Sequence, residues 1–163
     1  MTCFRCVLLL LAGLLILACD GGDSQPDLED EIVLLDYGQG FLRVDTREGS
    51  LDVLDPSEGL ILQRAFSEAA WRRSPEDEEQ VLRSLGRCSR DYERQEVTDA
   101  LGTADELVLS CHDAEAGLTL RWTLRAYAEA ESFTARVSLE SEQQVVLSRL
   151  VPLKVEAGRD GGR

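Results

Sequence analysis

Ten consecutive residues, Leu118 to Tyr127, alternate between apolar and polar side chains. A period of two sends successive side chains to opposite faces, which is the geometry of a β-strand and not of a helix. We expect a buried face of Leu118, Leu120, Trp122, Leu124 and Ala126, and an exposed face of Thr119, Arg121, Thr123, Arg125 and Tyr127. One buried and one wet face is typical of an antiparallel sheet.

Shorter segments of strand character recur from residue 31 onward. Turn residues separate them, as at 47–50, 55–59 and 113–117, and a spacing of about ten residues favours a sandwich or a barrel. We predict an all-β fold, an antiparallel β-sandwich that spans residues 31–163. Its expected strands are 31–36, 41–45, 51–54, 60–66, 107–111, 118–127, 133–139 and 145–155, the last bent near Pro152.

The segment 75–85 departs from this pattern. Ser74 and Pro75 can begin a helix, and Gly86 can end it. Val81, Leu82 and Leu85 would then share one helical face. The sequence therefore predicts a short helix, or a long loop, over 75–85.

The length of the apolar segment near the N-terminus, and the charge that precedes it, are typical of an export signal. One positive charge, Arg5, precedes an apolar run of 14 residues from Cys6 to Cys19. A membrane-spanning helix needs about 20 residues, whereas the apolar core of a signal peptide needs about 7 to 15. We therefore expect residues 1–18 to be a removable signal peptide; a buried core helix is the alternative.

The residues before Cys19 read Ile16-Leu17-Ala18-Cys19. This segment resembles a bacterial lipobox, in which an aliphatic and a small residue precede a cysteine that receives a lipid. Residues 20–26 then form a polar, glycine-containing tether. We expect Cys19 to be lipidated, residues 19–30 to link it to the sandwich, and the protein to be anchored in the bacterial envelope, facing the periplasm or the exterior.

Signal removal would leave two cysteines besides Cys19. They are Cys88 and Cys111, and an exported protein meets an oxidising compartment, where a disulfide between them is plausible. The alternative is two buried thiols that act as small apolar side chains. Neither lies in a Cys-x-x-Cys pair, so we expect no zinc or redox site.

The formal net charge is −14. A chain this acidic is repelled by nucleic acid and by anionic lipid surfaces, so we expect no nucleic-acid partner. Its acidic runs, Asp27–Glu31 and Glu76–Glu79, are interpreted as solvated loops or helix starts.

Several segments together resemble the N-terminal β-sandwich of the α-galactosidase and raffinose synthase group of glycoside hydrolases. They are an Asp-x-Leu-Gly turn, a Gly-Leu-x-Leu strand that runs on to a tyrosine, and a strand that ends in Leu-x-Pro-Leu. The turn is Asp99–Gly102, the strand begins at Gly117–Leu120 and reaches Tyr127, and the last segment is Leu147–Leu153. Thr46–Leu54 and Gly59–Leu62 also fit, so the resemblance covers about residues 30–157.

In that group the sandwich precedes a (β/α)₈ barrel that carries two catalytic aspartates. A barrel needs about 250 residues, so the resemblance assigns no catalytic residue and no cofactor to this chain. It implies a catalytic barrel as partner. Residues 158–163 look like a hairpin turn without its return strand, which favours the front piece of a longer protein over a frayed tail. The alternative function is a stand-alone lipoprotein that binds a carbohydrate or a protein without catalysis.

Individual side chains give little sign of chemistry. Asp99 and Asp113 are interpreted as turn formers, and His112 is the only histidine, too few for a metal site or a triad. Gly38 and Gly40 are interpreted as turn residues, because the third glycine of a phosphate loop is missing. Two tryptophans could stack on a sugar, but we expect Trp122 in the core and Trp71 in the core or an interface.

Overall fold

The structure, a computed structural model, describes residues 32–86 and 88–155. The predicted signal peptide (1–18), Cys19 and the linker (19–30) lie outside the described residues. Regular structure within the described part consists of ten β-strands. They are β1 (Ile32–Asp36), β2 (Phe41–Asp45), β3 (Ser50–Asp55), β4 (Gly59–Arg72), β5 (Gln80–Arg83), β6 (Ser89–Asp99), β7 (Gly102–Asp113), β8 (Leu118–Tyr127), β9 (Ser132–Ser141) and β10 (Val146–Val155).

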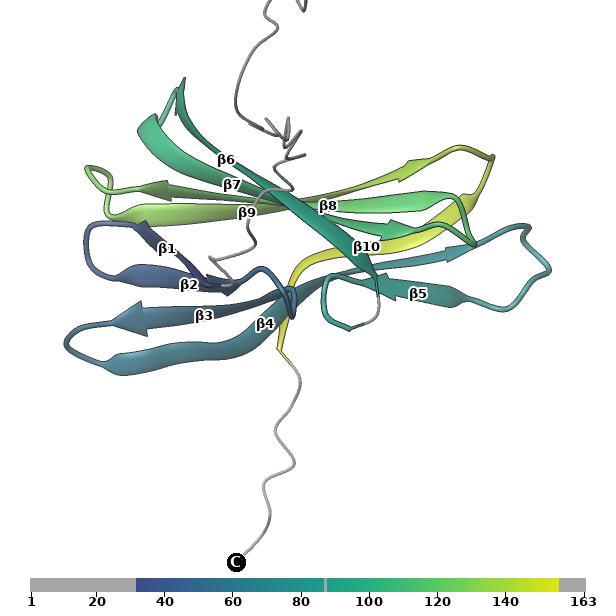
Figure 1. Ribbon diagram of the computed structural model, residues 1–163, viewed down its shortest axis with the longest axis horizontal. Coiled ribbons are helices and arrows are strands. Elements are labelled where there is room, and N and C mark those ends of the chain that lie inside the picture. The colour runs from purple at the N-terminus through teal and green to yellow at the C-terminus, as the bar shows by residue number, and fades with distance from the viewer. Residues whose placement is uncertain (1–31, 87, 156–163) are drawn as a thin grey trace, which may run out of the picture.

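The strands form two antiparallel sheets that pack as a sandwich, as predicted (Figure 1). Sheet A has the order β1-β2-β3-β4-β10, with β5 beside β4, and sheet B has the order β6-β7-β8-β9. The 14-residue β4 pairs with β10 along one edge; its opposite edge pairs first with β3 and then with β5. The last described strand, β10, therefore returns from sheet B to complete sheet A.

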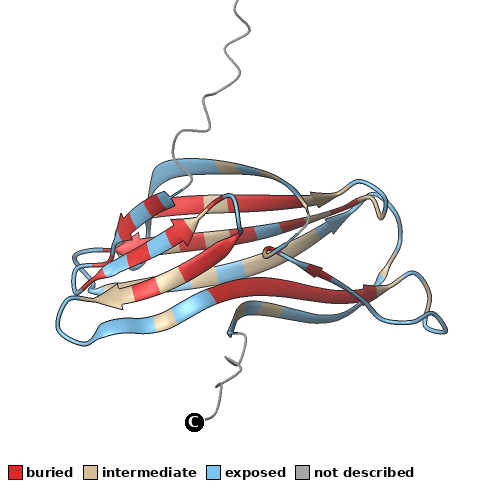
Figure 2. Cartoon of the chain, turned by 60° about the horizontal axis from the view of Figure 1, so that its bottom comes forward, coloured by how far each residue is buried: buried red, intermediate tan, exposed pale blue. Residues whose placement is uncertain are grey.

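The core lies between the inner faces of the two sheets. All five apolar residues predicted to face inward on β8 are buried there. Three of them, Leu120, Trp122 and Leu124, lie opposite Cys111, Leu109 and Leu107 of β7. Sheet A contributes alternate residues of its first strands, such as Val33, Leu35, Leu42 and Val44. Burial alternates residue by residue along β1, β2 and β8, whereas the second half of β4 is buried continuously (Figure 2).

Both tryptophans belong to the core. Trp122 is fully buried and Trp71 is 2% exposed. The prediction that Trp122 is a core residue is confirmed, and Trp71 takes the core alternative. Neither indole offers a face for stacking on a sugar.

The helix predicted over 75–85 is wrong. Residues 73–79 form a turn, in which the Ser74 amide donates to Asp77 at 2.9 Å, and residues 80–83 form β5. Leu82 points inward and is buried while Val81 is half exposed, so the side chains follow a period of two and not a helical face. Pairing with the exposed edge of β4 decides the outcome, because it satisfies backbone groups that β3 no longer reaches.

Candidate interaction face on sheet A

The outer faces of the two sheets carry different side chains. Eleven large apolar side chains are exposed among the described residues, and all but Leu101 belong to sheet A. They are Ile32, Leu34, Phe41, Leu60, Ile61, Val81, Val146, Leu147, Leu150 and Val155. Three of them, Leu147, Leu150 and Val155, lie opposite the inward-facing Trp71, Ala69 and Ala65, so they belong to the inner side of the edge strand β10 and not to the outer face. The outer face of sheet B instead presents Thr119, Arg121, Thr123 and Arg125 of β8, as the alternation predicted. The prediction that Tyr127 is exposed is wrong: it is 2% exposed, and its hydroxyl donates to Asp99. A concentration of exposed apolar side chains on one sheet marks it as a candidate interaction face.

The second half of β4 is buried on both of its faces. Ala65, Ala69 and Trp71 point into the core, which turns Phe66 and Glu68 to the outer face of sheet A. Both are nevertheless fully buried. Among the described residues, side chains of the two strands beside β4 lie over them.

Three cations surround the Glu68 carboxylate. Lys154 Nζ donates to Oε2 at 2.7 Å and Arg149 Nη2 donates to Oε1 at 2.7 Å, both from β10. Arg83 Nε donates to Oε2 at 2.9 Å from β5, where Arg83 lies directly opposite Glu68. We call these four residues the Glu68 cluster.

The cations decide the ionisation of Glu68. Burial would raise its pKa, but the hydrogen bonds from Lys154, Arg149 and Arg83 outweigh burial and hold the pKa below its ordinary value. Phe66 adds to the cluster, because its ring lies 5.6 Å from the Arg83 guanidinium carbon and 6.0 Å from Lys154 Nζ, within the range of cation–π attraction.

Other cations of sheet A pair with one carboxylate each. Arg43 contacts Asp52 at 3.4 Å, and Arg64 contacts Glu48 at 3.3 Å. The Glu68 cluster differs because Arg149 and Lys154 share a single carboxylate. It therefore carries positive charge on the face of a strongly acidic chain.

Asp99 and Asp113 act as turn formers, as predicted. Asp99 Oδ1 accepts from the Leu101 amide at 2.8 Å, and Asp113 Oδ1 accepts from the amides of Glu115 and Ala116, both at 3.1 Å. Each carboxylate closes its own turn.

Asp99 also joins a polar network on the outer face of sheet B. Its Oδ2 accepts from Tyr127 Oη at 2.6 Å and from Arg125 at 2.8 Å, and Arg125 also contacts Glu106. The Tyr127 hydrogen bond lowers the pKa of Asp99; for Glu106, hydrogen bonds from Gln95 and Arg125 outweigh the opposing effect of burial and lower its pKa. Both carboxylates are thus ionised, whereas glycoside hydrolysis needs one protonated acid.

His112 has two hydrogen-bond partners. Its Nδ1 lies 3.0 Å from Thr119 Oγ1 and its Nε2 lies 3.1 Å from Asp91 Oδ2. This chain of groups borders a polar hollow of about 470 Å³ whose lining includes Glu140. β8 is hydrogen-bonded to a strand on each side, so its amides are already used and do not supply the donors that acyl transfer requires.

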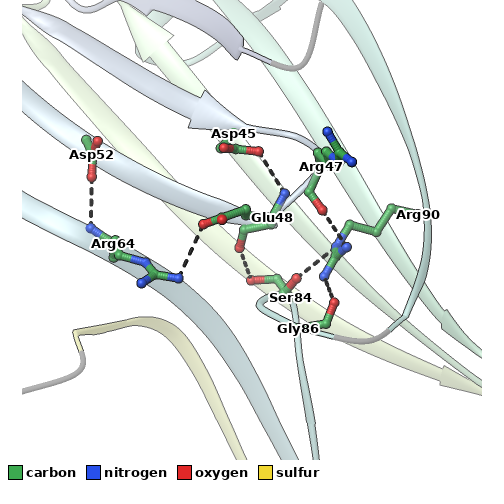
Figure 3. Close-up of polar contacts among 9 residues, drawn as sticks. Asp45, Arg47, Glu48, Asp52, Arg64, Ser84, Gly86 and Arg90 are labelled. Carbon is green, nitrogen blue, oxygen red and sulfur yellow. Dashed lines mark hydrogen bonds and ion pairs between the residues drawn. The ribbon is translucent and has the colours of Figure 1, made fainter. Parts of the chain in front are cut away.

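Arg90 joins the end of β5 to a turn of sheet A (Figure 3). Its guanidinium donates to three backbone carbonyls: Ser84 at 3.0 Å, Arg47 at 2.6 Å, and Gly86. Ser84 Oγ in turn donates to the Gly49 carbonyl at 2.8 Å. Gly49 has a φ of +74°, and a Cβ there would lie 1.8 Å from the backbone carbonyl oxygen of Ser84, so the turn needs glycine. We call this contact set the Arg90 clamp; its role is structural.

A disulfide lies beside the clamp. Cys88 and Cys111 are bonded, with their Cα atoms 5.5 Å apart. Cys88 immediately precedes β6, and Cys111 lies opposite Arg90 on β7. The bond therefore fastens the start of β6 to the neighbouring strand of sheet B.

Within residues 32–86 and 88–155, no group of three or more His, Cys, Asp or Glu side chains is placed to hold a metal ion. The same residues contain no helix long and apolar enough to cross a bilayer. Sequence reasoning missed the Glu68 cluster, because its members lie up to 86 residues apart. No family model matches the chain, and no significant match to it was found among curated proteins or solved structures.

Proposed function

We propose that this chain is a lipid-anchored protein of the bacterial envelope that acts as a non-catalytic docking module. The observation that carries the docking role is the concentration of exposed apolar side chains on sheet A. Surfaces of this kind are typical of protein contact sites. The anchor rests on the lipobox-like segment that ends at Cys19.

The resemblance to α-galactosidase-like hydrolases suggests the partner, a catalytic barrel. An accessory sandwich holds its barrel through a face and needs no paired carboxylates of its own. The ionised state of both Asp99 and Glu106 agrees with a module that does not itself cleave glycosides.

Two measurements test the anchor. Mass spectrometry of the mature N-terminus should find a lipid on Cys19, and Cys19→Ala should move the protein from the membrane to the soluble fraction. An unlipidated N-terminus at another residue contradicts the anchor.

The partner is tested with a barrel encoded downstream of, or beside, this gene. Sedimentation should show that the barrel binds the mature chain, and Phe41→Asp on sheet A should weaken binding about tenfold or more. The matched substitution Thr123→Asp on sheet B should leave binding unchanged. Equal effects of the two substitutions contradict docking through sheet A.

A second candidate function follows from the hollow beside His112. Its lining of hydroxyl, imidazole and carboxylate groups, among them Thr119 and Glu140, could bind the hydroxyl groups of a sugar. Calorimetry of the mature chain against glycans tests it, and Thr119→Val should abolish any binding at this site. Binding that survives Thr119→Val places the sugar elsewhere.

A further inference from the structure

We infer that the Glu68 cluster receives carboxylate groups from an acidic protein surface. This inference rests on the proposed docking role of sheet A and adds the chemistry of the partner. Its starting point is the two cations of β10, Arg149 and Lys154, which share one buried carboxylate. Two positive charges against one leave a positive surface there.

The cationic groups remain partly open to solvent. The side chain of Arg149 is 51% exposed and that of Lys154 is 38% exposed, whereas Glu68 beneath them is 1% exposed. A guanidinium has five N–H donors and an ammonium three. Each uses one described hydrogen bond on Glu68, so both retain donors for a second acceptor.

Glu68 also fixes these groups in place. A buried carboxylate holds its cations by short hydrogen bonds, and the Phe66 ring supports the Lys154 ammonium from below. A flexible surface lysine loses side-chain entropy when it binds, whereas a cation that is already held loses less. The cluster is therefore a preorganised receptor for a second anion.

The surroundings favour a protein over a lipid surface. Val81 is 45% exposed and lies opposite Ala70 on the same outer face, and Val151 lies opposite Glu68. Apolar side chains beside fixed charges are typical of protein interfaces. An anionic bilayer would also repel a chain of net charge −14, but a carboxylate at short range responds to the local cluster.

The first test is photocrosslinking in the bacterium that makes this protein. p-Benzoylphenylalanine replaces Val81 in the full chain, with Thr123 on sheet B as the matched control position. We expect an adduct at Val81, at several times the Thr123 yield, with a protein whose crosslinked peptide contains Asp or Glu. An adduct with lipid, an adduct with a peptide that lacks carboxylates, or equal yields at both positions overturns the inference.

The second test is charge exchange. Arg149→Glu and Lys154→Glu, made singly and checked by circular dichroism, should each lower the Val81 adduct yield about tenfold. Replacing the crosslinked carboxylate of the partner by lysine should restore the yield with Arg149→Glu. A merely structural role of Arg149 would give no such rescue. Arg121→Glu on sheet B, where Arg121 pairs with the single carboxylate of Glu140, is the control and should leave the yield unchanged.

A third probe position separates this inference from the proposed function. If p-benzoylphenylalanine at Phe41 captures the partner but Arg149→Glu has no effect on the yield, sheet A docks without the Glu68 cluster and only the inference fails. If neither Phe41 nor Val81 yields an adduct, the docking role fails as well. Should the charge variants unfold, the peptide crosslinked at Val81 in the otherwise unaltered chain still decides the chemistry.

Discussion

The outer faces of sheets A and B each contain a buried glutamate, and the two sheets neutralise its charge with different numbers of cations. Both strands β4 and β7 place a glutamate on an outer face, Glu68 and Glu106, and both glutamates are buried. Glu106 and its neighbour Asp99 share one arginine, Arg125, whereas Glu68 pairs with three cations. On sheet B two carboxylates share one cation, so negative charge is in excess. On sheet A one carboxylate pairs with three cations, so positive charge is in excess, beside exposed apolar side chains.

We interpret the charge balance on sheet B as serving stability and the excess of cations on sheet A as serving binding. A wet face needs its charges balanced only well enough to remain hydrated, and the alternating arginines and threonines of β8 achieve that. Buried charge on an apolar face gains nothing from water and must be compensated by the protein. Compensation beyond one charge is therefore better explained by a second anion than by stability alone.

The largest expected difference between the two sheets is in the unfolding free energy lost when Glu68 or Glu106 is replaced. Glu68→Ala should lower the free energy of unfolding by about 3 kcal/mol, because three cations lose their shared acceptor and repel one another. Glu106→Ala should cost about 1 kcal/mol, because Arg125 keeps Asp99. Urea unfolding followed by the fluorescence of the buried Trp71 and Trp122 measures both. Equal losses would contradict the contrast between the faces.

The Arg90 clamp tests whether the link between the sheets depends on geometry or on charge. Arg90→Ala should lower the free energy of unfolding by about 1–2 kcal/mol, since three backbone carbonyls lose a donor. Arg90→Lys should lose nearly as much, because an ammonium does not reproduce the planar guanidinium that reaches all three. The exposed pair offers the control: Arg43→Ala should change stability by less than about 0.5 kcal/mol. Native stability in Arg90→Lys would show that charge alone suffices.

Acid should lower the free energy of unfolding through carboxylates on both sheets. Comparison with Glu68→Gln should show how much of that loss comes from Glu68 on sheet A. The pKa values of Glu68, Asp99 and Glu106 are all lowered in the fold. The stability they contribute is therefore complete above the pKa of the unfolded chain, about 4.3 for glutamate, and is lost as the pH falls through the folded value. Unfolding measured between about pH 3 and 7 should give a shallower loss for Glu68→Gln than for the unaltered chain. Parallel curves would contradict the lowered pKa.

Local pattern predicted most of the sandwich but missed β6. The segment 89–99 is rich in charged side chains, its burial is low, and its position is fixed by an eleven-pair ladder with β7. No alternation of apolar residues announces such a strand, because little of it faces the core. β5 was missed for a related reason, since only the open edge of β4 makes a strand of four residues stable there.

The candidate site was less predictable than the fold. Glu68 lies just beyond the strand predicted over 60–66, and its partners Arg149 and Lys154 come more than 80 residues later. The pairing of β4 with β10 brings them together through two register shifts. Sequence reasoning could see neither the register nor the burial. It did place Asp99, Asp113 and Trp122 correctly, because turn chemistry and alternation are local.

The smallest expected effect concerns the apolar surface itself. Leu60 is about half exposed on sheet A, so Leu60→Asp removes little buried area, and it should change stability by no more than about 0.5 kcal/mol. Thr123→Asp on sheet B should be equally mild. The two substitutions should differ in dye binding: the fluorescence of 8-anilinonaphthalene-1-sulfonate, which reports exposed apolar surface, should fall for Leu60→Asp and stay constant for Thr123→Asp. Because the dye is anionic, Arg149→Gln distinguishes attraction to the Glu68 cluster from attraction to apolar surface. Dye binding that falls for Arg149→Gln but not for Leu60→Asp would show that charge, and not apolar exposure, sets sheet A apart from sheet B.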